Sequence, residues 1–373
     1  MKVSLDVSAV PAHLAGAGRY IGELARRLPT LDVQSTLVTR RGDADRWRRW
    51  SPRSSVAAIV PDARVPRLLY EAWSLGTSAP ARESDVWHAP HYTMPHRGAT
   101  PTVVTIHDLT FFTNPEWHER SKVAFFKRAI TYSAHHAKVL ISVSDFTARQ
   151  IDEFLPGHGP VVVAPLGVDL KRFSPEGTDD ASLFEASGLS TEVPYVFFLG
   201  TIEPRKGLDV LLAAFEDLSR DDGSLELWLA GQAGWGLKDF EERLARHPAA
   251  SRIRRLGFVD EELLPALLRR SRVVAYPSRG EGFGLPVLEA MACGAAVVTS
   301  EDTVMAEVAG DCAVLTRAGD PATLAEALRG VLALDQRDRD MRSTRSRERA
   351  ATFSWDSSMA RHLEAYELAR SGA

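Results

Sequence analysis

Two glutamates, Glu281 and Glu289, enclose a glycine-containing segment in the last third of the chain. Gly282 and Gly284 between them lack a Cβ atom, so backbone N–H groups there can approach a ligand closely. The apolar run Leu285–Cys293 predicts a helix, and the positive end of a helix dipole attracts an anion. Carboxylates on either side of such a site can accept hydrogen bonds from hydroxyl groups. A nucleotide sugar, which carries phosphate flanked by hydroxyls, meets these demands.

A pair of adjacent cations precedes another predicted helix. Arg205 and Lys206 follow the predicted strand Tyr195–Leu199, and a helical pattern begins at Leu208. An arginine can bind two phosphate oxygens at once and a lysine supplies a mobile charge, so the pair can neutralise a diphosphate. Stabilising a departing nucleotide diphosphate is the main electrostatic demand of sugar transfer. The alternative is an ordinary solvated Arg–Lys pair, and the nearby glutamate segment argues against it.

The first half of the chain holds further candidate residues. Gly16 and Gly18 follow the first predicted strand, but position 21 is isoleucine, so the segment is not a dinucleotide fingerprint and NAD is not expected. His107 ends the predicted strand Thr102–Ile106, where an imidazole can hydrogen-bond a sugar or orient the reacting groups. A histidine that is satisfied within its own loop is the alternative.

Short apolar runs alternate with helical patterns along the whole chain, which predicts parallel α/β sheets. Each half is expected to form a doubly wound, Rossmann-like sheet that binds ligands at the carboxyl ends of its strands. The breaker-rich segment Pro165–Pro175 marks a junction. We therefore expect one domain over residues 1–175, a second over 176–354, and a terminal helix over 355–373.

Helices are expected in the first half at three places. They are Gly18–Leu28, Trp117–His135 and Asp145–Phe154, the last with Ser144 as its polar N-cap.

Composition limits the class of protein. The 373 residues are 45% hydrophobic, and no apolar run is long enough to span a membrane. The N-terminus reads as a strand and lacks the apolar core of a signal peptide, so a cytoplasmic location is expected. Two cysteines make no disulfide framework and no zinc site is expected.

Residues 1–175 carry 22 basic and 16 acidic residues, against 23 and 33 in the remainder. With a net charge of −4 and no recognition module, nucleic acid is not an expected partner.

The segment Glu281–Gly294 closely resembles the E-x7-E signature of retaining GT-B glycosyltransferases, the family called glycosyl transferases group 1. The likeness includes Pro286 and the following Leu-Glu-Ala-Met-Ala-Cys-Gly helix. Gly200–Gly207 resembles the family's Gly-Thr-x-x-Pro-x-Lys segment, and Pro165–Asp169 its Pro-x-Gly-Val-Asp motif at the domain junction. The resemblance covers nearly the whole chain. It implies two Rossmann-like domains facing across a cleft, with the last helix returning to the N-terminal domain.

The resemblance also implies roles. Glu289 would bind ribose hydroxyls, Glu281 would bind hydroxyls of the donor sugar, and His107 would lie beside that sugar. The base is expected near Phe258 and Val259, although such residues after a strand are usually core. The residues implied around the nucleotide sugar are Gly16, Gly18, Thr201, Arg205, Lys206, Phe258, Val259, Glu281, Gly282, Phe283, Gly284, Leu285 and Glu289, and the implied catalytic set is His107, Glu281, Arg205 and Lys206.

No metal ion and no cofactor beyond the nucleotide sugar are expected. Asp338 and Asp340 are two residues apart, but they lie in the arginine-rich segment Arg337–Arg349, which reads as a solvated helix. Arg205 and Lys206 would replace the cation. Because no nucleophilic carboxylate can be named, our hypothesis for retention is a front-face displacement, in which the leaving phosphate oxygen helps to deprotonate the acceptor.

The resemblance also suggests a donor and an acceptor. The residues around the motifs resemble those of mannosyltransferases, so GDP-mannose is the first expected donor. UDP-glucose, UDP-N-acetylglucosamine and UDP-galactose are the alternative donors. The acceptor would be a glycan, glycolipid or polyprenyl-linked chain in cell-envelope polysaccharide synthesis, with His88 and His91 on the acceptor side. The Arg/Trp segment 40–53 either contacts an anionic membrane peripherally at its inner face or is a helix whose indoles pack inward. Two alternative functions are a GT-B nucleotide-sugar epimerase and a non-catalytic nucleotide-sugar-binding protein.

Overall fold

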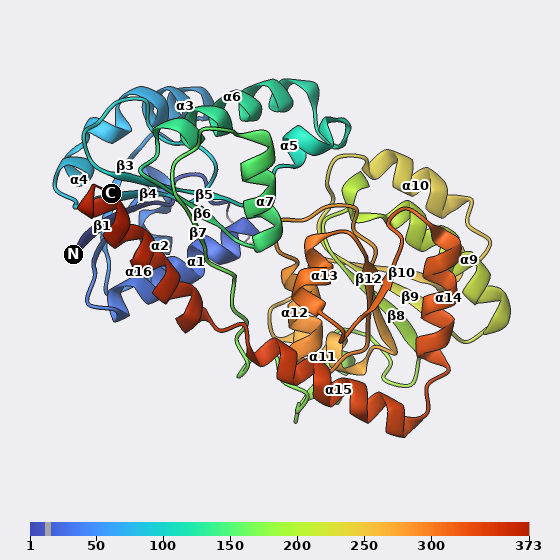
Figure 1. The fold of residues 1–373 in the computed structure, drawn as a ribbon. Helices are drawn as coiled ribbons and strands as arrows, with labels where there is room; N and C mark the ends of the chain where they lie inside the picture. The colour runs from blue at the N-terminus through green and yellow to red at the C-terminus, as the bar shows by residue number, and fades with distance from the viewer. Residues whose placement is uncertain (12–15, 373) are drawn as a thin grey trace. The chain divides into compact units, whose positions relative to one another are not determined.

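The computed structural model describes residues 1–11 and 16–372 (Figure 1). The chain forms two compact units. Unit 1 is Met1–Gly167 together with Trp355–Ala373, and unit 2 is Val168–Ser354. The first unit therefore ends before the expected boundary at residue 175. The reason is local, because the Val168 N–H donates to the Phe353 carbonyl at 3.1 Å and a guanidinium N–H of Arg172 donates to the Glu261 carbonyl at 2.8 Å.

Unit 1 contains a seven-stranded parallel sheet with the strand order β3-β2-β1-β4-β5-β6-β7. Its strands are β1 (Lys2–Asp6), β2 (Gln34–Arg40), β3 (Ser55–Val60), β4 (Val86–Ala89), β5 (Thr102–Ile106), β6 (Val139–Ser142) and β7 (Val161–Val163). Its α-helices are α1 (Ala17–Arg27), α2 (Ala44–Trp50), α3 (Arg64–Trp73), α4 (Ala79–Arg82), α5 (Thr110–Thr113), α6 (Arg120–His136), α7 (Asp145–Phe154) and α16 (Trp355–Ser371), with 3-10 turns η1 (Leu28–Thr30), η2 (Arg41–Asp43), η3 (Leu75–Thr77) and η4 (Pro115–Trp117).

Unit 2 contains a six-stranded parallel sheet with the order β10-β9-β8-β11-β12-β13. Its strands are β8 (Tyr195–Leu199), β9 (Glu226–Ala230), β10 (Ile253–Gly257), β11 (Val273–Tyr276), β12 (Val297–Ser300) and β13 (Val314–Thr316). Its α-helices are α8 (Asp180–Ala186), α9 (Leu208–Asp221), α10 (Leu237–Ala245), α11 (Leu263–Arg270), α12 (Leu285–Ala292), α13 (Val304–Ala309), α14 (Pro321–Leu332) and α15 (Gln336–Ala351), with 3-10 turns η5 (Pro204–Lys206) and η6 (Ala250–Arg252).

The two sheets share one topological feature that positions ligand-binding loops. In unit 1 the strand β1 lies between β2 and β4, and in unit 2 the strand β8 lies between β9 and β11. The chain therefore reverses its winding direction beside β1 and beside β8. In open parallel sheets, ligands bind at such a switch point, outside the carboxyl ends of the strands. The loops after β8 and β11 are thus the natural place for a site in unit 2.

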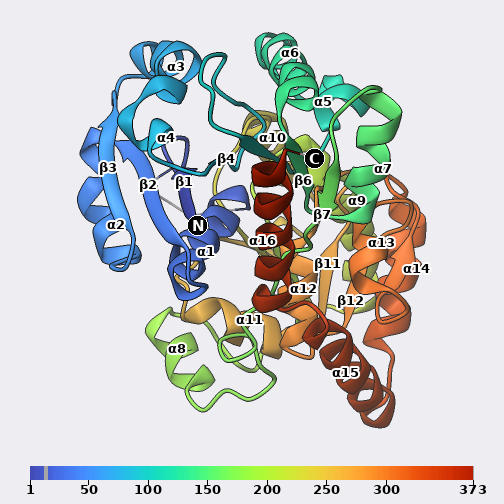
Figure 2. The same cartoon turned by 60° about the vertical axis from the view of Figure 1, so that its left-hand side comes forward.

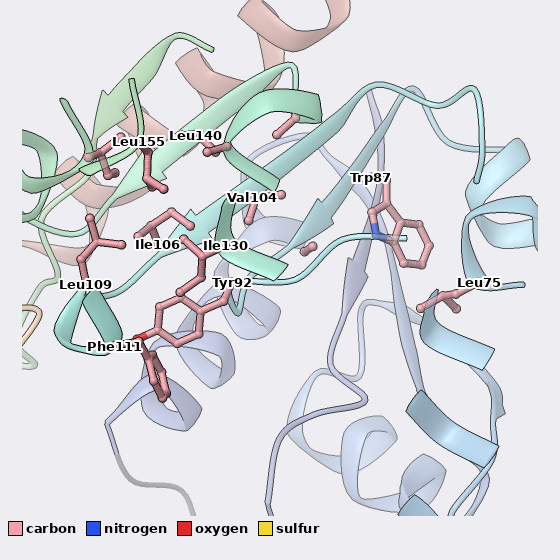
Figure 3. Packing of buried hydrophobic residues seen from close by; sticks show 14 of the residues in the cluster. Leu75, Trp87, Tyr92, Val104, Ile106, Leu109, Phe111, Ile130, Leu140 and Leu155 are labelled. Atoms are coloured by element: carbon pink, nitrogen blue, oxygen red, sulfur yellow. The ribbon is translucent and has the colours of Figure 1, made fainter. Parts of the chain in front are cut away.

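The central strands of unit 1 are buried on both faces, which explains their continuous apolar sequences. Every residue of β5 and β6 is buried. Figure 3 shows the packing around β4 and β5, where Val104 and Ile106 of β5 meet side chains such as Ile130, Leu140 and Leu155 from flanking elements. This core holds the end of β5, and with it His107, in one place.

A chain of buried polar side chains fastens the last helix to the sheet of unit 1. Helix α16 packs on β4 to β7 and on α1 (Figure 2). Tyr366 of α16 binds His88 Nδ1 at 2.8 Å, and His88 Nε2 binds Thr105 at 2.8 Å. Thr105 binds the Tyr20 hydroxyl at 2.8 Å, which in turn lies 2.7 Å from His362 Nε2 of α16. Both ring nitrogens of His88 are therefore used inside the core, and the expected acceptor-side role of His88 is wrong.

The Ser358 carbonyl fixes which group donates and which accepts in each hydrogen bond of this series of side chains. His362 Nδ1 lies 2.7 Å from the Ser358 carbonyl, so it must carry the proton and Nε2 must accept. Tyr20 then donates to His362, Thr105 donates to Tyr20, and His88 Nε2 donates to Thr105. Burial lowers the pKa of His362 to about 4 and that of His88 well below its ordinary value, so both rings are neutral as this direction requires.

Candidate functional site

Arg205, Lys206 and Glu281 meet in unit 2. The two cations lie in η5, after β8, and Glu281 lies in the loop after β11. Because β8 and β11 are neighbouring parallel strands, their following loops leave the sheet at the same edge. Lys206 Nζ lies 2.5 Å from Glu281 Oε1, and Arg205 Nη1 lies 2.7 Å from Oε2. Three residues that the sequence analysis singled out in separate motifs thus form one cluster.

Two further residues hold Glu281, and neither was predicted from the sequence. The Tyr276 hydroxyl donates to Glu281 Oε1 at 3.0 Å, and the Ser278 hydroxyl donates to the same oxygen at 2.7 Å. Tyr276 also accepts a hydrogen bond from Lys206 Nζ at 2.8 Å. Tyr276 ends an apolar strand and Ser278 follows a proline, so neither has a spacing that signals a site.

Glu281 is an ionised carboxylate in this setting. Burial alone would raise its pKa, but the charges of Arg205 and Lys206 and the hydrogen bonds from Lys206 and Ser278 outweigh burial and hold the pKa at about 2. Arg205 makes a second ion pair, with Glu203 at 2.9 Å. Two cations and two carboxylates therefore balance within the cluster. A phosphate group entering here would take over these cations as partners.

Gly207 brings the cationic turn close to the loop after β11. Its φ of +69° lies in the left-handed region, which favours glycine. A Cβ atom at this position would lie 2.1 Å from the Pro277 carbonyl oxygen. Only a glycine therefore lets the backbone after Lys206 pass this close to the loop that carries Glu281.

The rest of the glutamate segment lies around the start of α12. Gly284 has a φ of +97° and directly precedes the helix. Phe283 and Leu285 are buried, and the Phe283 ring packs edge-on against Phe353 with centroids 5.8 Å apart. Glu289 is buried within α12. The structure thus brings Glu281 into contact with Arg205 and Lys206, and it uses Phe283 as an apolar anchor for the loop.

A cavity of about 230 Å³ opens at the carboxyl ends of β8, β9 and β10, and its lining residue Gly200 lies close to the Lys206 side chain. Its lining includes Gly200, Gly231 and Gly257, whose backbones form a surface without side chains. Gly231 approaches its neighbour closely, because a Cβ atom there would lie 2.0 Å from the Gly200 carbonyl oxygen. Arg255 supplies a charged side chain to the lining and pairs with Glu241 of α10 at 3.0 Å. A flat heterocycle with polar edges fits such a surface.

The residues expected at the base lie next to this cavity. Phe258 follows Gly257 and its side chain is 53% exposed, so it is not a core residue. Val259 is half-buried. Neither is among the residues that line the cavity, whereas Gly257 is. Thr201, also half-buried, follows the lining residue Gly200.

In unit 1, His107 is a buried and neutral histidine. Its Nε2 lies 2.8 Å from the Pro90 carbonyl, so Nε2 carries the proton and Nδ1 is left as an acceptor. Burial lowers its pKa, and the opposing effects of Pro90 and Asp108 are smaller. The Tyr20 ring meets the imidazole edge-on, with centroids 5.1 Å apart. A neutral imidazole that presents Nδ1 can accept a hydrogen bond from a hydroxyl group.

Three other candidates lie near the same edge of the sheet. Gly16 is exposed, has a φ of +48° and directly precedes α1, whereas Gly18 is buried inside that helix. His91 packs against His107 with ring centroids 5.8 Å apart, and burial lowers its pKa to about 4. Gly16 thus has the backbone freedom of a binding loop, and Gly18 serves helix packing.

The Arg/Trp segment 40–53 buries Trp47 and exposes four of its six arginines. Trp47 is buried, and a guanidinium N–H of Arg46 donates to the Pro11 carbonyl at 2.7 Å. Arg40 pairs with Asp43 at 2.5 Å. The indole of Trp47 packs into the protein and Trp50 is half-buried, while Arg41, Arg48, Arg49 and Arg53 are exposed.

Comparison with known proteins gives the family. The sequence profile of glycosyl transferases group 1 matches residues 179–349, and that of glycosyltransferase family 4 matches residues 14–172. Residues 179–349 thus belong to the glycosyl transferases group 1 family. This glycosyltransferase is 29% identical to O-antigen chain mannosyltransferase B of Escherichia coli, over 99% of its own length and 100% of that protein.

Solved structures give the same fold. Sucrose-phosphate synthase of Thermosynechococcus elongatus superposes with a TM-score of 0.80 at 19% identity, over 100% of both chains. Anabaena HepE in complex with UDP-glucose gives a TM-score of 0.74 at 18% identity, also over 100% of both chains. The glycosyltransferase therefore has the GT-B fold, built from two parallel-sheet α/β domains.

Residues 1–11 and 16–372 contain no group of three or more His, Cys, Asp or Glu side chains arranged to hold a metal ion. Within the same residues, no helix is both long and apolar enough to cross a bilayer.

Proposed function

We propose that this glycosyltransferase moves mannose from GDP-mannose to a growing glycan, glycolipid or polyprenyl-linked acceptor, with retention of the anomeric configuration. The observation that carries the proposal is the cluster in which Arg205 and Lys206 bind Glu281 at the same sheet edge as the cavity at the ends of β8, β9 and β10. The proposed reaction would take place in the cytoplasm, at the inner membrane face, in polysaccharide synthesis for the cell envelope. The similarity to an O-antigen mannosyltransferase supports the sugar.

The cluster suggests how a diphosphate is received. Arg205 and Lys206 are already fixed by carboxylates, so their side chains lose little freedom when phosphate oxygens replace those carboxylates. The released Glu281 carboxylate can accept hydrogen bonds from hydroxyl groups of the donor sugar. Glu289 keeps the proposed role of binding ribose hydroxyls.

The reaction we propose is a front-face displacement. The bond from the anomeric carbon to the diphosphate oxygen breaks, the acceptor oxygen bonds to that carbon from the same face, and the acceptor proton passes to the leaving phosphate. Arg205 and Lys206 stabilise the charge on the departing diphosphate. We propose no metal requirement, since these two cations supply that charge. His107 would accept a hydrogen bond from a donor-sugar hydroxyl through Nδ1.

The cavity supports guanine as the base. The Arg255 guanidinium is donor-only, and guanine offers it O6 and N7 as a pair of acceptors. Its partner Glu241 is acceptor-only and suits the N1–H and N2 donors of the same base. Uracil lacks the paired acceptors, and adenine presents a donor in place of O6.

Calorimetric titration with GDP, UDP and ADP tests this proposal. We expect GDP to bind at least about tenfold tighter than the others, and Arg255→Gln to lose about tenfold for GDP alone. Arg254→Gln is the matched control, because adjacent strand residues face opposite sides of the sheet and Arg254 packs over Trp228. If UDP binds most tightly, guanine is not the base of the donor, but the proposed sugar transfer is not contradicted.

Turnover assays test the reaction itself. With GDP-mannose and mannose-terminated acceptors, we expect release of GDP that persists in EDTA, and a product with the donor's anomeric configuration by NMR. Loss of turnover in EDTA with recovery on adding Mg²⁺ would refute metal independence. Donor consumption without acceptor and without GDP release would indicate an epimerase, and binding without any turnover would indicate a non-catalytic protein.

A further inference from the structure

Helix α3 of unit 1 carries a row of large apolar side chains that are each more than half exposed. Val65, Leu69 and Trp73 are 67%, 59% and 51% exposed. They are four residues apart, so they lie above one another on one face of the helix. Single exposed apolar residues are ordinary, but an aligned row of three, one of them an indole, marks an interaction surface. We call this row the α3 stripe.

The opposite face of α3 is fixed to the rest of unit 1, so the α3 stripe is held outward. Tyr70 packs against the core cluster of unit 1. Glu71 Oε1 lies 2.8 Å from the hydroxyl of Ser8, which follows β1. Arg67 Nε lies 3.4 Å from Glu71, so this arginine also belongs to the inner face. The α3 stripe is therefore exposed on a helix whose opposite face is packed against unit 1.

Positive charge borders the α3 stripe. The Arg97 guanidinium lies 5.3 Å from the centre of the Trp73 ring. Arg64, exposed at the start of α3, directly precedes Val65. The acidic residue of α3, Glu71, is turned inward toward Ser8. An anionic surface is the electrostatic complement of this border.

We propose that the α3 stripe is a docking surface for an anionic lipid bilayer. An amphipathic helix that lies in the interface places aliphatic side chains among the acyl chains, an indole at the headgroup level and arginines on lipid phosphates, and α3 offers all three. The contact deepens the proposed function, because a lipid-linked acceptor is held at such a surface. Through Glu71 and Ser8 the helix is joined to the carboxyl end of β1, the sheet edge where ligands bind.

Vesicle co-sedimentation of the full chain tests this surface without requiring turnover. The vesicles are phosphatidylcholine alone or mixed with phosphatidylglycerol. We expect the wild type to bind only the anionic vesicles, and less so at high salt. The variant Val65→Ser/Leu69→Ser/Trp73→Ser should lose at least about tenfold in partitioning. The control Leu315→Ser/Met341→Ser, which removes apolar side chains that are 36% and 50% exposed in unit 2, should bind like the wild type.

Fluorescence quenching by brominated lipid provides a second measurement that does not depend on the triple variant. Quenching in the wild type should fall sharply in Trp73→Phe, because Trp73 is the indole expected at the bilayer. Equal partitioning of the triple variant and the wild type would overturn the proposal, and so would a lack of wild-type binding to anionic vesicles. A wild-type dimer that the triple variant converts to a monomer would show that a second copy covers the stripe, which also overturns it. Nucleotide binding by the same samples reports separately on the proposed function.

Discussion

The ammonium group of Lys206 lies 2.5 Å from Oε1 of Glu281, although 75 residues separate the two in sequence. Both side chains are nearly buried, at 9% and 10% exposure. A buried carboxylate that loses its cation costs far more than an exposed one, because water cannot replace the partner. This pair therefore ties the proposed donor site to the stability of unit 2.

Replacing one partner of this pair should destabilise the fold. We expect Lys206→Met to lower the free energy of unfolding by about 3–5 kcal/mol, and Lys206→Met/Glu281→Gln to recover most of that loss. The matched control is Lys122→Met, which breaks an exposed pair with Glu119 at 2.7 Å and should change little. Urea unfolding of the four proteins measures the effect. Equal losses in Lys206→Met and in the double variant would mean that Glu281 is not stabilised by Lys206.

The buried chain through Tyr20 and His362 should contribute to holding α16 in place. Tyr20→Phe leaves the His362 acceptor and the Thr105 donor without their partner, and each unsatisfied buried group is costly. We expect a loss of about 1–3 kcal/mol in the free energy of unfolding. Tyr70→Phe, in which a half-buried tyrosine loses the same atom, is the control and should stay close to the wild type. A Tyr20→Phe protein as stable as this control would show that the hydroxyl adds nothing.

Features that depend on local chemistry could be predicted from the sequence. Helix α7 spans Asp145–Phe154 as expected, and Ser144 caps it by accepting a hydrogen bond from the Thr147 N–H at 3.0 Å. The parallel α/β character of both halves followed from the apolar runs. The resemblance implied that Arg205 and Glu281 belong to one donor site, and the adjacency of β8 and β11 gives the physical basis of the ion pair between them.

Features that depend on distant or outward-facing residues could not be predicted. Helix α3 was missed because Pro66 interrupts its pattern and its apolar row faces outward, against the rule that such a row faces the core. His88 was assigned to the acceptor side because its partner Tyr366 is 278 residues away. The helix expected at Trp117–His135 begins instead at Arg120, after a 3-10 turn that Pro115 starts.

Stability should fall with rising pH because of Glu71. Its pKa is raised from 4.5 to about 7, first by burial and then by the charge of Asp6. The Ser8 hydroxyl lies 2.6 Å from Asp6 and 2.8 Å from Glu71, yet it has one proton to donate, so one carboxyl of the two must carry its own. A carboxyl with a raised folded pKa loses stability as pH climbs from its unfolded value through its folded value.

The expected window is therefore pH 4.5 to a little above 7, with a total of no more than about 3 kcal/mol. Glu71→Gln should remove this loss, so that the variant gains stability relative to the wild type between pH 5 and pH 8. Thermal unfolding of both proteins across this range measures the difference. The control is Glu23→Gln, which changes a carboxyl paired with Arg27 at 2.9 Å on α1. A difference between wild type and Glu71→Gln that stays constant with pH would show that Glu71 does not titrate there.

Gly207 and Gly188 offer a test of how closely the cationic turn must approach the loop of Glu281. Both have left-handed φ angles, +69° and +64°, so an alanine suffers similar backbone strain of about 1–2 kcal/mol at either place. The surroundings differ, since a Cβ atom at Gly207 would lie 2.1 Å from the Pro277 carbonyl oxygen and one at Gly188 meets nothing within 4 Å. Gly207→Ala must therefore also push the two loops apart.

We expect Gly207→Ala to lose about 1–3 kcal/mol more than Gly188→Ala in urea unfolding. It should also weaken GDP binding at least about tenfold, because a shift near 1 Å in Lys206 misplaces a charge meant for the diphosphate. Gly188→Ala should bind GDP like the wild type. If both variants lose equal stability and bind GDP equally, the close approach at Pro277 has no part in positioning Lys206, and the cluster owes its geometry to the ion pairs alone.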